Sequence, residues 1–178
     1  MDGNNAKQLT NSPLDSSASP DVSPDGKWVL YTKSGKEKGI WKVPMEGGDP
    51  VQLTDVEGGS AVFSPDGRWI AYFYRDTKAK PTQGVAIMPS KGGSPTRSVD
   101  IPMEPFRWTA DGRSLLFIKY ASGVSNIWSQ PITGGAPKQI THFNTQHIWD
   151  FDLSPDGKRI VIERGEVTGD AVLIRDLR

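Results

Sequence analysis

The chain has 178 residues, with 21 Lys and Arg against 21 Asp and Glu, and it has no cysteine. This length suits about one ordinary domain. The balanced charge, with basic residues scattered singly among acidic ones, argues against a nucleic-acid partner, which requires a cationic surface. The lack of cysteine excludes a disulfide framework, a thiolate nucleophile and cysteine-ligated zinc. Six Trp, six Phe and four Tyr still supply enough apolar surface for a packed core.

The N-terminal residues 1–5 contain neither a basic region nor an apolar run. No later stretch approaches the roughly 20 apolar residues of a membrane-spanning helix. We therefore expect no membrane insertion by this chain. Any export signal or anchor would have to lie on sequence outside it, so composition alone leaves the compartment open.

A six-residue segment recurs four times along the chain. Residues 23–28 read Ser-Pro-Asp-Gly-Lys-Trp, and similar segments stand at 64–69, 109–114 and 154–159. Their shared Asp-Gly pairs are Asp25 and Gly26, Asp66 and Gly67, Asp111 and Gly112, and Asp156 and Gly157, with the Asp residues 41, 45 and 45 positions apart. Gly-Gly pairs at 47–48, 92–93 and 134–135 keep the same phase. Two markers with one period indicate an internal structural repeat.

Short runs rich in Val, Ile, Trp and Tyr lie between these markers and predict β-strands, and no run suggests a helix of useful length. In chain order, the predicted strands cover residues 28–32, 40–43, 51–54, 69–74, 85–88, 115–119, 126–129, 138–141, 159–163 and 171–174. Each Asp-Gly segment predicts a tight turn between the first two strands of a unit, because Pro fixes φ, Asp bonds the local backbone and Gly accepts a positive φ. The Gly-Gly pairs predict the turn between the third and fourth strands.

Each unit is thus expected to be a four-stranded antiparallel meander, which is the blade of a β-propeller. We predict an all-β propeller of about four blades, at residues 17–54, 60–99, 104–141 and 148–178, the last of them lacking its fourth strand.

A segment near the N-terminus bears on that missing strand. Residues 7–10, Lys-Gln-Leu-Thr, match the fourth-strand sequences at 51–54 and 138–141. Either this segment completes the last blade and closes a four-bladed ring, or the chain is part of a larger propeller and the segment belongs to a preceding blade. We favour the larger propeller as its origin. A homodimer that shares strands through its sheet edges is a third arrangement.

The combination of S-P-D-G-[KR]-W, I-W-x-x-P and G-G-x-P-x-Q-[LI]-T resembles the TolB-type, WD-like repeat of bacterial β-propellers. It is carried by residues 23–28, 40–44 and 47–54, and again by 127–131 and 134–141. Two departures, Ala110 in place of the turn Pro and residues 96–99 in place of Q-L-T, concern turn and strand fit and leave the fold prediction intact.

The resemblance implies a fold more than a function, because the same blades occur in the TolB translocation protein, in prolyl-oligopeptidase-like enzymes and as sensor-like ends of bacterial signalling proteins. The last blade looks most similar to the C-terminal propellers of bacterial serine/threonine kinases or winged-helix regulators. By this resemblance, the parent protein is expected to place the propeller in the periplasm or otherwise outside the cytoplasm.

Motifs of common catalytic sites are absent from the chain. No G-x-S-x-G nucleophile elbow, P-loop, H-E-x-x-H motif or dinucleotide fingerprint occurs. We therefore expect no catalytic residues and no cofactor. Both histidines lie in the polar run 142–150, whose spacing gives no geometric ligand set, so we expect surface histidines rather than a metal site. Asp152, in a predicted first strand, is expected to face the central channel as a solvated carboxylate.

The turns and connections of a propeller alternate between its two faces. The Asp-Gly and Gly-Gly turns are uniform and share one face, whereas the connections from second to third and from fourth to first strands vary and share the other. Recognition is expected on this variable face, because loops on a rigid scaffold commonly carry it. The candidate interaction residues are Arg75, Asp76, Trp108, Tyr120, His142, Asn144, His147 and Trp149. The repeated positions of Trp28, Trp41, Trp69 and Trp128 indicate packing between blades instead.

These observations favour a non-catalytic module that binds a protein or peptide partner, or a small ligand, as part of a larger bacterial protein. One alternative is the gating propeller of a prolyl-oligopeptidase-like hydrolase, whose nucleophile would lie on another domain. Another alternative is an oligomerisation element with open sheet edges.

Overall fold

A computed structural model describes residues 6–10, 17–75 and 82–166. These residues form fourteen strands and no helix, and so no helix of the described part could cross a membrane. The strands are β1 (Ser17–Val22), β2 (Trp28–Lys33), β3 (Gly39–Pro44), β4 (Val51–Gln52), β5 (Glu57–Phe63), β6 (Trp69–Arg75), β7 (Gln83–Pro89), β8 (Arg97–Val99), β9 (Phe106–Trp108), β10 (Ser114–Ala121), β11 (Val124–Pro131), β12 (Lys138–Gln139), β13 (His147–Leu153) and β14 (Ile160–Gly165).

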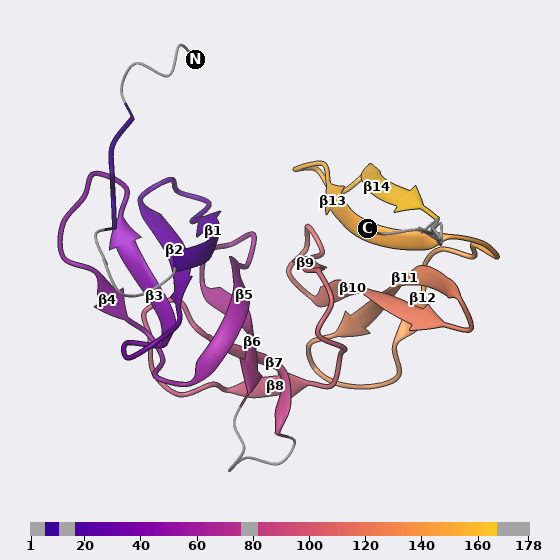
Figure 1. The fold of residues 1–178 in the computed structure, drawn as a ribbon, viewed down its shortest axis with the longest axis horizontal. Helices are drawn as coiled ribbons and strands as arrows, with labels where there is room; N and C mark the ends of the chain where they lie inside the picture. The colour runs from indigo at the N-terminus through magenta and orange to yellow at the C-terminus, as the bar shows by residue number, and fades with distance from the viewer. Residues whose placement is uncertain (1–5, 11–16, 76–81, 167–178) are drawn as a thin grey trace, which may run out of the picture.

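The strands make three four-stranded antiparallel meanders, β1–β4, β5–β8 and β9–β12, followed by the β13–β14 pair. Figure 1 shows these four sheets following one another along an arc, with β1, β5 and β9 toward its inner side. The prediction of an all-β propeller of about four blades is confirmed. The predicted strand at 171–174 lies outside the described residues.

The fourth strand of a blade is shorter than predicted. Pairing in the first sheet ends at Gln52 opposite Trp41, and β4 keeps two residues rather than four. The amides of Leu53 and Thr54 both turn to the carbonyl oxygen of Ile40, at 2.8 and 3.3 Å. The outer strand therefore leaves the ladder early while its backbone donors stay satisfied.

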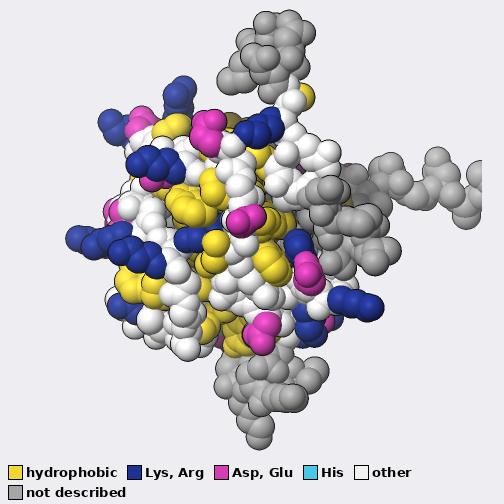
Figure 2. Space-filling view, turned by 90° about the vertical axis from the view of Figure 1, so that its left-hand side faces the viewer, with side chains coloured by type: hydrophobic (Ala, Val, Ile, Leu, Met, Phe, Trp, Pro, Cys, Tyr) yellow, Lys and Arg dark blue, Asp and Glu magenta, His cyan; other side chains and the backbone are white. Residues whose placement is uncertain are grey.

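The surface on the side of the first sheet carries both signs of charge. Figure 2 shows Lys and Arg side chains interspersed with Asp and Glu, around a band of hydrophobic side chains, with no continuous area of one sign. The neutral balance of the sequence is thus also a local balance on this side of the molecule.

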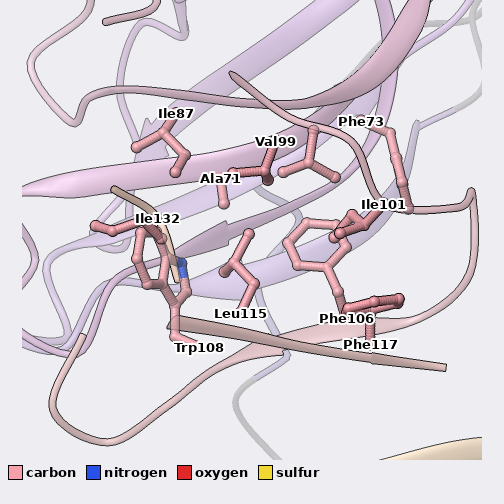
Figure 3. Close-up of a cluster of buried hydrophobic side chains, with 11 residues drawn as sticks. Ala71, Phe73, Ile87, Val99, Ile101, Phe106, Trp108, Leu115, Phe117 and Ile132 are labelled. Atoms are coloured by element: carbon pink, nitrogen blue, oxygen red, sulfur yellow. The ribbon is translucent and has the colours of Figure 1, made fainter. Parts of the chain in front are cut away.

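The core lies between neighbouring sheets and follows the two-residue period of the strands. In β6, Ile70 and Tyr72 face the first sheet, while Ala71 and Phe73 face the third. In Figure 3, Phe73 of the second sheet meets Phe106 of the third edge to face, with ring centroids 5.0 Å apart. Each sheet is thus buried by the next, and the buried side chains form three clusters, one at each interface between successive sheets.

The Trp residues predicted to pack between blades do so at three of four positions. Trp28, Trp69 and Trp128 are partly buried against the clusters between sheets. Trp41 belongs to none of these clusters; its ring lies 4.2 Å from the Lys33 ammonium, and its indole nitrogen donates to the carbonyl oxygen of Glu37. That prediction is corrected for Trp41, because its side of β3 faces away from the second sheet.

The repeated Asp-Gly segment builds one hydrogen-bonded turn four times. At the second copy, the Ser64 hydroxyl donates to Asp66 Oδ1 at 2.6 Å, and the Arg68 amide donates to the same oxygen at 3.0 Å. The Gly67 amide closes the turn on the Ser64 carbonyl at 2.8 Å, with φ of 68° at Gly67. The hydrogen bond from Ser64, together with Arg68, lowers the pKa of Asp66 to about 2. The turns predicted at all four Asp-Gly pairs are confirmed.

Residues 7–10 form no strand and do not extend the β13–β14 pair. The Lys7 ammonium instead donates to the Glu46 carbonyl oxygen, in the turn between β3 and β4 of the first sheet. Closure of a four-bladed ring by this segment would need the predicted strand at 171–174, which lies outside the described residues, so this alternative stays a prediction. In the described part of the chain, the segment lies beside the first blade (Figure 1).

We predict that Gly26→Val lowers the free energy of unfolding by about 1–3 kcal/mol, because a β-branched residue is strained at positive φ. Gly26 has φ of 70°, and no atom lies within 4 Å of the place of a Cβ, so the cost isolates backbone strain. Urea denaturation measures it. Lys27→Val, at an exposed neighbouring position without positive φ, is the control. Equal stability of the two variants would contradict the turn geometry.

The turn carboxylates predict a dependence of stability on pH. Because the pKa of Asp66 is lowered from 3.8 to about 2 in the folded chain, its ionised form stabilises the fold above about pH 4, and this contribution is lost as the pH falls toward 2. Asp66→Asn should therefore be less stable than the parent at pH 7, with the difference shrinking between pH 4 and pH 2. Asp49→Asn, at an exposed position before β4, is the control. A difference that stays constant over this range would count against the prediction.

Candidate functional site

The turns and the connections lie on opposite faces, as the sequence predicts. The Met45 amide, beside the Gly-Gly turn, donates to the Lys27 carbonyl of the Asp-Gly turn at 2.8 Å. On the other face, the Ile40 amide at the start of β3 donates to the Thr54 hydroxyl at 3.1 Å, where the chain leaves the fourth strand. The connections of variable length and sequence therefore share one face, which is called the variable face below.

Three aromatic rings form a stack on the variable face. Tyr120, near the end of β10, stacks on His147 at the start of β13, with ring centroids 5.0 Å apart and planes 17° from parallel. His147 stacks in turn on Trp149, at 5.4 Å and 15°. Tyr120 is 54% exposed and Trp149 is 46% exposed. We call these three residues the aromatic ladder; it joins the third and fourth sheets.

The strand period explains why the ladder is exposed. His147 and Trp149 are two residues apart on β13 and share a side, while the intervening Ile148 is buried in the cluster between the third and fourth sheets. The pairing of β13 with β14 shifts register between Ile148 and Asp150, beside Trp149. Local irregularities of this kind re-aim side chains in strands.

One hollow adjoins the ladder, and a second hollow shares Glu104 with it. The first, of about 290 Å³, is lined by Glu104, Ile118, Tyr120, Ser125, His147, Ile148 and Trp149. The second, of about 310 Å³, is lined by residues of β5 and β6 together with Met103, Glu104 and Pro105. Glu104 lies in the connection between the second and third sheets, so the two hollows reach across three sheets on the variable face.

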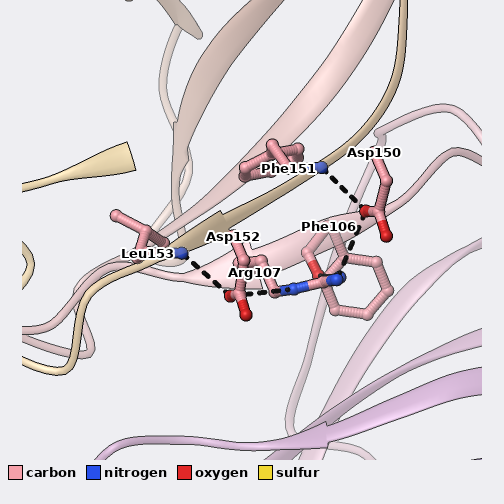
Figure 4. A network of polar contacts seen from close by, with 6 residues as sticks. All are labelled: Phe106, Arg107, Asp150, Phe151, Asp152 and Leu153. Atoms are coloured by element: carbon pink, nitrogen blue, oxygen red, sulfur yellow. Dashed lines mark hydrogen bonds and ion pairs between the residues drawn. The ribbon is translucent and has the colours of Figure 1, made fainter. Parts of the chain in front are cut away.

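A larger hollow of about 660 Å³ lies between the innermost strands and forms the channel. Figure 4 shows Arg107 between two carboxylates, with its guanidinium 3.3 Å from Asp150 and 3.4 Å from Asp152. Asp152 lines the channel and is exposed, as the sequence predicts. Burial raises the pKa of Asp21 on the same wall, while the Phe63 amide, donating at 2.7 Å, and Arg107 oppose that rise.

The structure brings together three of the predicted interaction residues, Tyr120, His147 and Trp149. Arg75 is exposed at the second hollow, where its guanidinium lies 3.7 Å from Met103 Sδ. His142 and Asn144 are exposed on the connection before β13 and line neither hollow. Asp76 lies outside the described residues.

Trp108 is a correction to the predicted surface. It is 6% exposed, belongs to the core between the second and third sheets, and its indole nitrogen donates to the Val62 carbonyl at 3.3 Å. The two-residue period of the short strand β9 turns both Phe106 and Trp108 toward the second sheet. Although it is buried, Trp108 is also one of the residues that line the channel.

Sequence reasoning missed Glu104, Met103 and Arg107. Glu104 and Met103 lie on a connection between blades, which is the kind of segment predicted to vary, and that signal could have singled them out. Within residues 6–10, 17–75 and 82–166, no three His, Cys, Asp or Glu side chains are grouped so as to hold a metal ion.

The repeated four-stranded meanders and the channel lined by first strands define a β-propeller. The solved structures that it resembles are TolB-like propellers. A protein from Agrobacterium tumefaciens assigned as TolB matches with a TM-score of 0.69 and 24% identity, over 86% of this chain and 55% of that one. TolB from Acinetobacter baumannii matches with a TM-score of 0.56 and 18% identity, over 83% and 43%. The chain thus spans about half the length of these propellers.

Other similar structures have different functions. A prolyl endopeptidase matches with a TM-score of 0.59 and 16% identity, over 84% of this chain and 26% of that one. An oligogalacturonate lyase and the nidogen/laminin complex are further examples, so enzymes and non-enzymes share the fold. No family profile matches the chain, and no curated protein matches it in sequence. The resemblance of the last blade to kinases or winged-helix regulators stays a prediction.

We predict that Arg107→Gln raises the pKa of Asp21 further, because the guanidinium is one of the groups that lower it. A titration of side-chain carboxyl signals by carbon-13 NMR measures this directly. Arg113→Gln, at an exposed turn position outside the channel lining, is the control and should leave Asp21 unchanged. An unaltered Asp21 titration in the Arg107 variant would show that the channel charges do not interact.

Proposed function

We propose that this chain is a non-catalytic propeller module that binds a peptide segment of a protein partner on its variable face. The observation that carries the proposal is the aromatic ladder of Tyr120, His147 and Trp149, whose two outer rings are exposed and which lines the first hollow. The hollows give such a segment a path from the ladder across the third sheet toward the second.

The ladder has the properties of an anchoring surface. Tyr and Trp present large, stiff side chains that lose little conformational entropy on binding, and they dominate the energetics of many protein interfaces. Tyr120 and Trp149 are among the most exposed large apolar side chains of the described part. The buried Ile118 and Ile148, which line the hollow beside them, belong to the core beneath, so the ladder rests on a rigid base.

The similar structures support a binding role in general terms, since TolB proteins and the nidogen/laminin complex are among them. A location outside the cytoplasm is part of the same proposal, on the basis of the TolB-type fold. The sequence contains no G-x-S-x-G motif, which agrees with a module that does not carry a serine nucleophile.

A second candidate is the gating propeller of a prolyl-oligopeptidase-like hydrolase. The likeness to a prolyl endopeptidase motivates it, because this chain matches only 26% of that protein. In that case the nucleophile would lie on an α/β domain, and the reading frame around the chain would encode a G-x-S-x-G motif. A reading frame without such a domain would eliminate this candidate.

The proposal predicts that peptides selected for binding to the full chain from a random display library lose affinity at least about tenfold, or roughly 1.4 kcal/mol, with Tyr120→Ala or Trp149→Ala. Isothermal titration calorimetry with synthetic peptides measures the loss. Val51→Ala, 42% exposed in β4 next to a Gly-Gly turn, is the control and should change affinity less than twofold. Peptides that bind all variants equally, or a library that yields none, would refute the proposed function.

A further inference from the structure

We infer that the first hollow, between the aromatic ladder and Glu104, receives an arginine side chain of the bound segment. This inference rests on the proposed function and deepens it, because it names the chemical group that the site recognises. The guanidinium would lie against the ladder and form an ion pair with the Glu104 carboxylate.

Cations of this chain lie over several of its other aromatic rings. Six rings each have a Lys or Arg cation of the same chain 3.5 to 5.9 Å from the centroid, and these are Trp28, Trp41, Trp69, Trp128, Phe143 and Phe151. Cations over ring faces are attracted by the ring quadrupole. Among the described residues, no cation of the chain lies over the rings of the ladder. Tyr120 and Trp149 are therefore exposed rings without a cation of the described chain, and both line the first hollow.

The carboxylate of Glu104 lies at the same hollow. Its backbone amide donates to the Pro102 carbonyl at 2.8 Å, which fixes the connection, but its side chain makes no hydrogen bond or ion pair within the described ranges. Glu104 is exposed and lines the same hollow as all three ladder rings. A cation in this hollow would thus have the aromatic ladder on one side and a carboxylate without a described partner on the other.

Arginine suits this arrangement better than lysine. The guanidinium is planar, weakly hydrated and able to stack on an aromatic ring while it donates two parallel hydrogen bonds to a carboxylate. An ammonium is a strongly hydrated point charge without a flat face. Arg164 shows such packing within the protein itself, because its guanidinium lies 3.5 Å from the centroid of the Phe143 ring.

The test uses small probes and the full chain. In proton–nitrogen NMR spectra, N-acetylarginine amide is titrated against the protein, and the indole signal of Trp149 is assigned with Trp149→Phe. N-acetylcitrulline amide has nearly the same shape without the charge, and N-acetyllysine amide has the charge without the plane. We expect a saturable shift of the Trp149 indole signal with the arginine probe, and at least about fivefold weaker binding of the other two.

The variant that tests the carboxylate is Glu104→Gln, which keeps the size of an exposed side chain and removes its charge. It should abolish the preference for arginine over citrulline. Glu57→Gln, which alters a second exposed carboxylate that lines the second hollow but not the first, is the matched control and should retain that preference. Equal binding of arginine and citrulline to the parent chain, equal binding of lysine, or an unchanged preference in Glu104→Gln would each overturn the inference.

The same reagents separate this inference from the proposed function. Selected peptides that require Tyr120 and Trp149 but carry no arginine, and that bind the Glu104→Gln variant as tightly as the parent, would keep the proposed function and overturn the arginine site. Selected peptides indifferent to the ladder, together with an arginine probe that shifts Trp149 and requires Glu104, would do the reverse.

Discussion

The structure depends on the two-sided burial of thin antiparallel sheets. A four-stranded sheet of short strands cannot bury enough apolar surface by itself, so each blade must lay one set of alternate side chains on the preceding blade and the other set on the following one. The strand β10 shows this directly: Leu115 and Phe117 belong to the core toward the second sheet, while Leu116 and Ile118 belong to the core toward the fourth. The repeat in the sequence is the consequence, since each inner blade has to pack on one neighbour at either side.

The hydrogen-bonded turns make this stacking precise. Each Asp-Gly turn fixes where the second strand of a blade begins, and register determines which side chains face which neighbour. The turn requires a positive φ, which Gly67 provides, and it is stabilised by the Asp66 carboxylate, which accepts hydrogen bonds from a hydroxyl and an amide. Because these turns occupy one face, the other face can vary its connections without disturbing the register, and it is there that Tyr120, His147 and Trp149 meet.

Much of the fold could be predicted from the sequence because its signals are local. The turn residues and the β-rich runs between them are contiguous, and they specify the meander directly. The ends of the fourth strands could not be predicted, since β4 stops where the Leu53 amide finds the Ile40 carbonyl across the sheet. The burial of Trp108 depends on an equally distant partner, the Val62 carbonyl.

The candidate site was predictable only in part, because some of its contacts join residues that are distant in the sequence. His147 and Trp149 stand together in one polar run, and their exposure follows from the sequence. Their stacking with Tyr120 depends on how the third sheet packs on the fourth, and the nearness of Glu104 depends on a connection from the second sheet. The spacing of residues along the chain does not predict that residues from three blades lie close together.

The ladder also ties the last described sheet to its neighbour. In an array of repeats each blade packs only on its neighbours, so the third and fourth sheets, which meet at the cluster around Ile118, Ile148 and Phe151, can separate in a local opening event. Opening would carry His147 and Trp149 away from Tyr120, which stays on the third sheet. A partner that binds Tyr120 and Trp149 together would therefore stabilise the contact between the third and fourth sheets. Its binding would slow amide hydrogen exchange in β13 and β14.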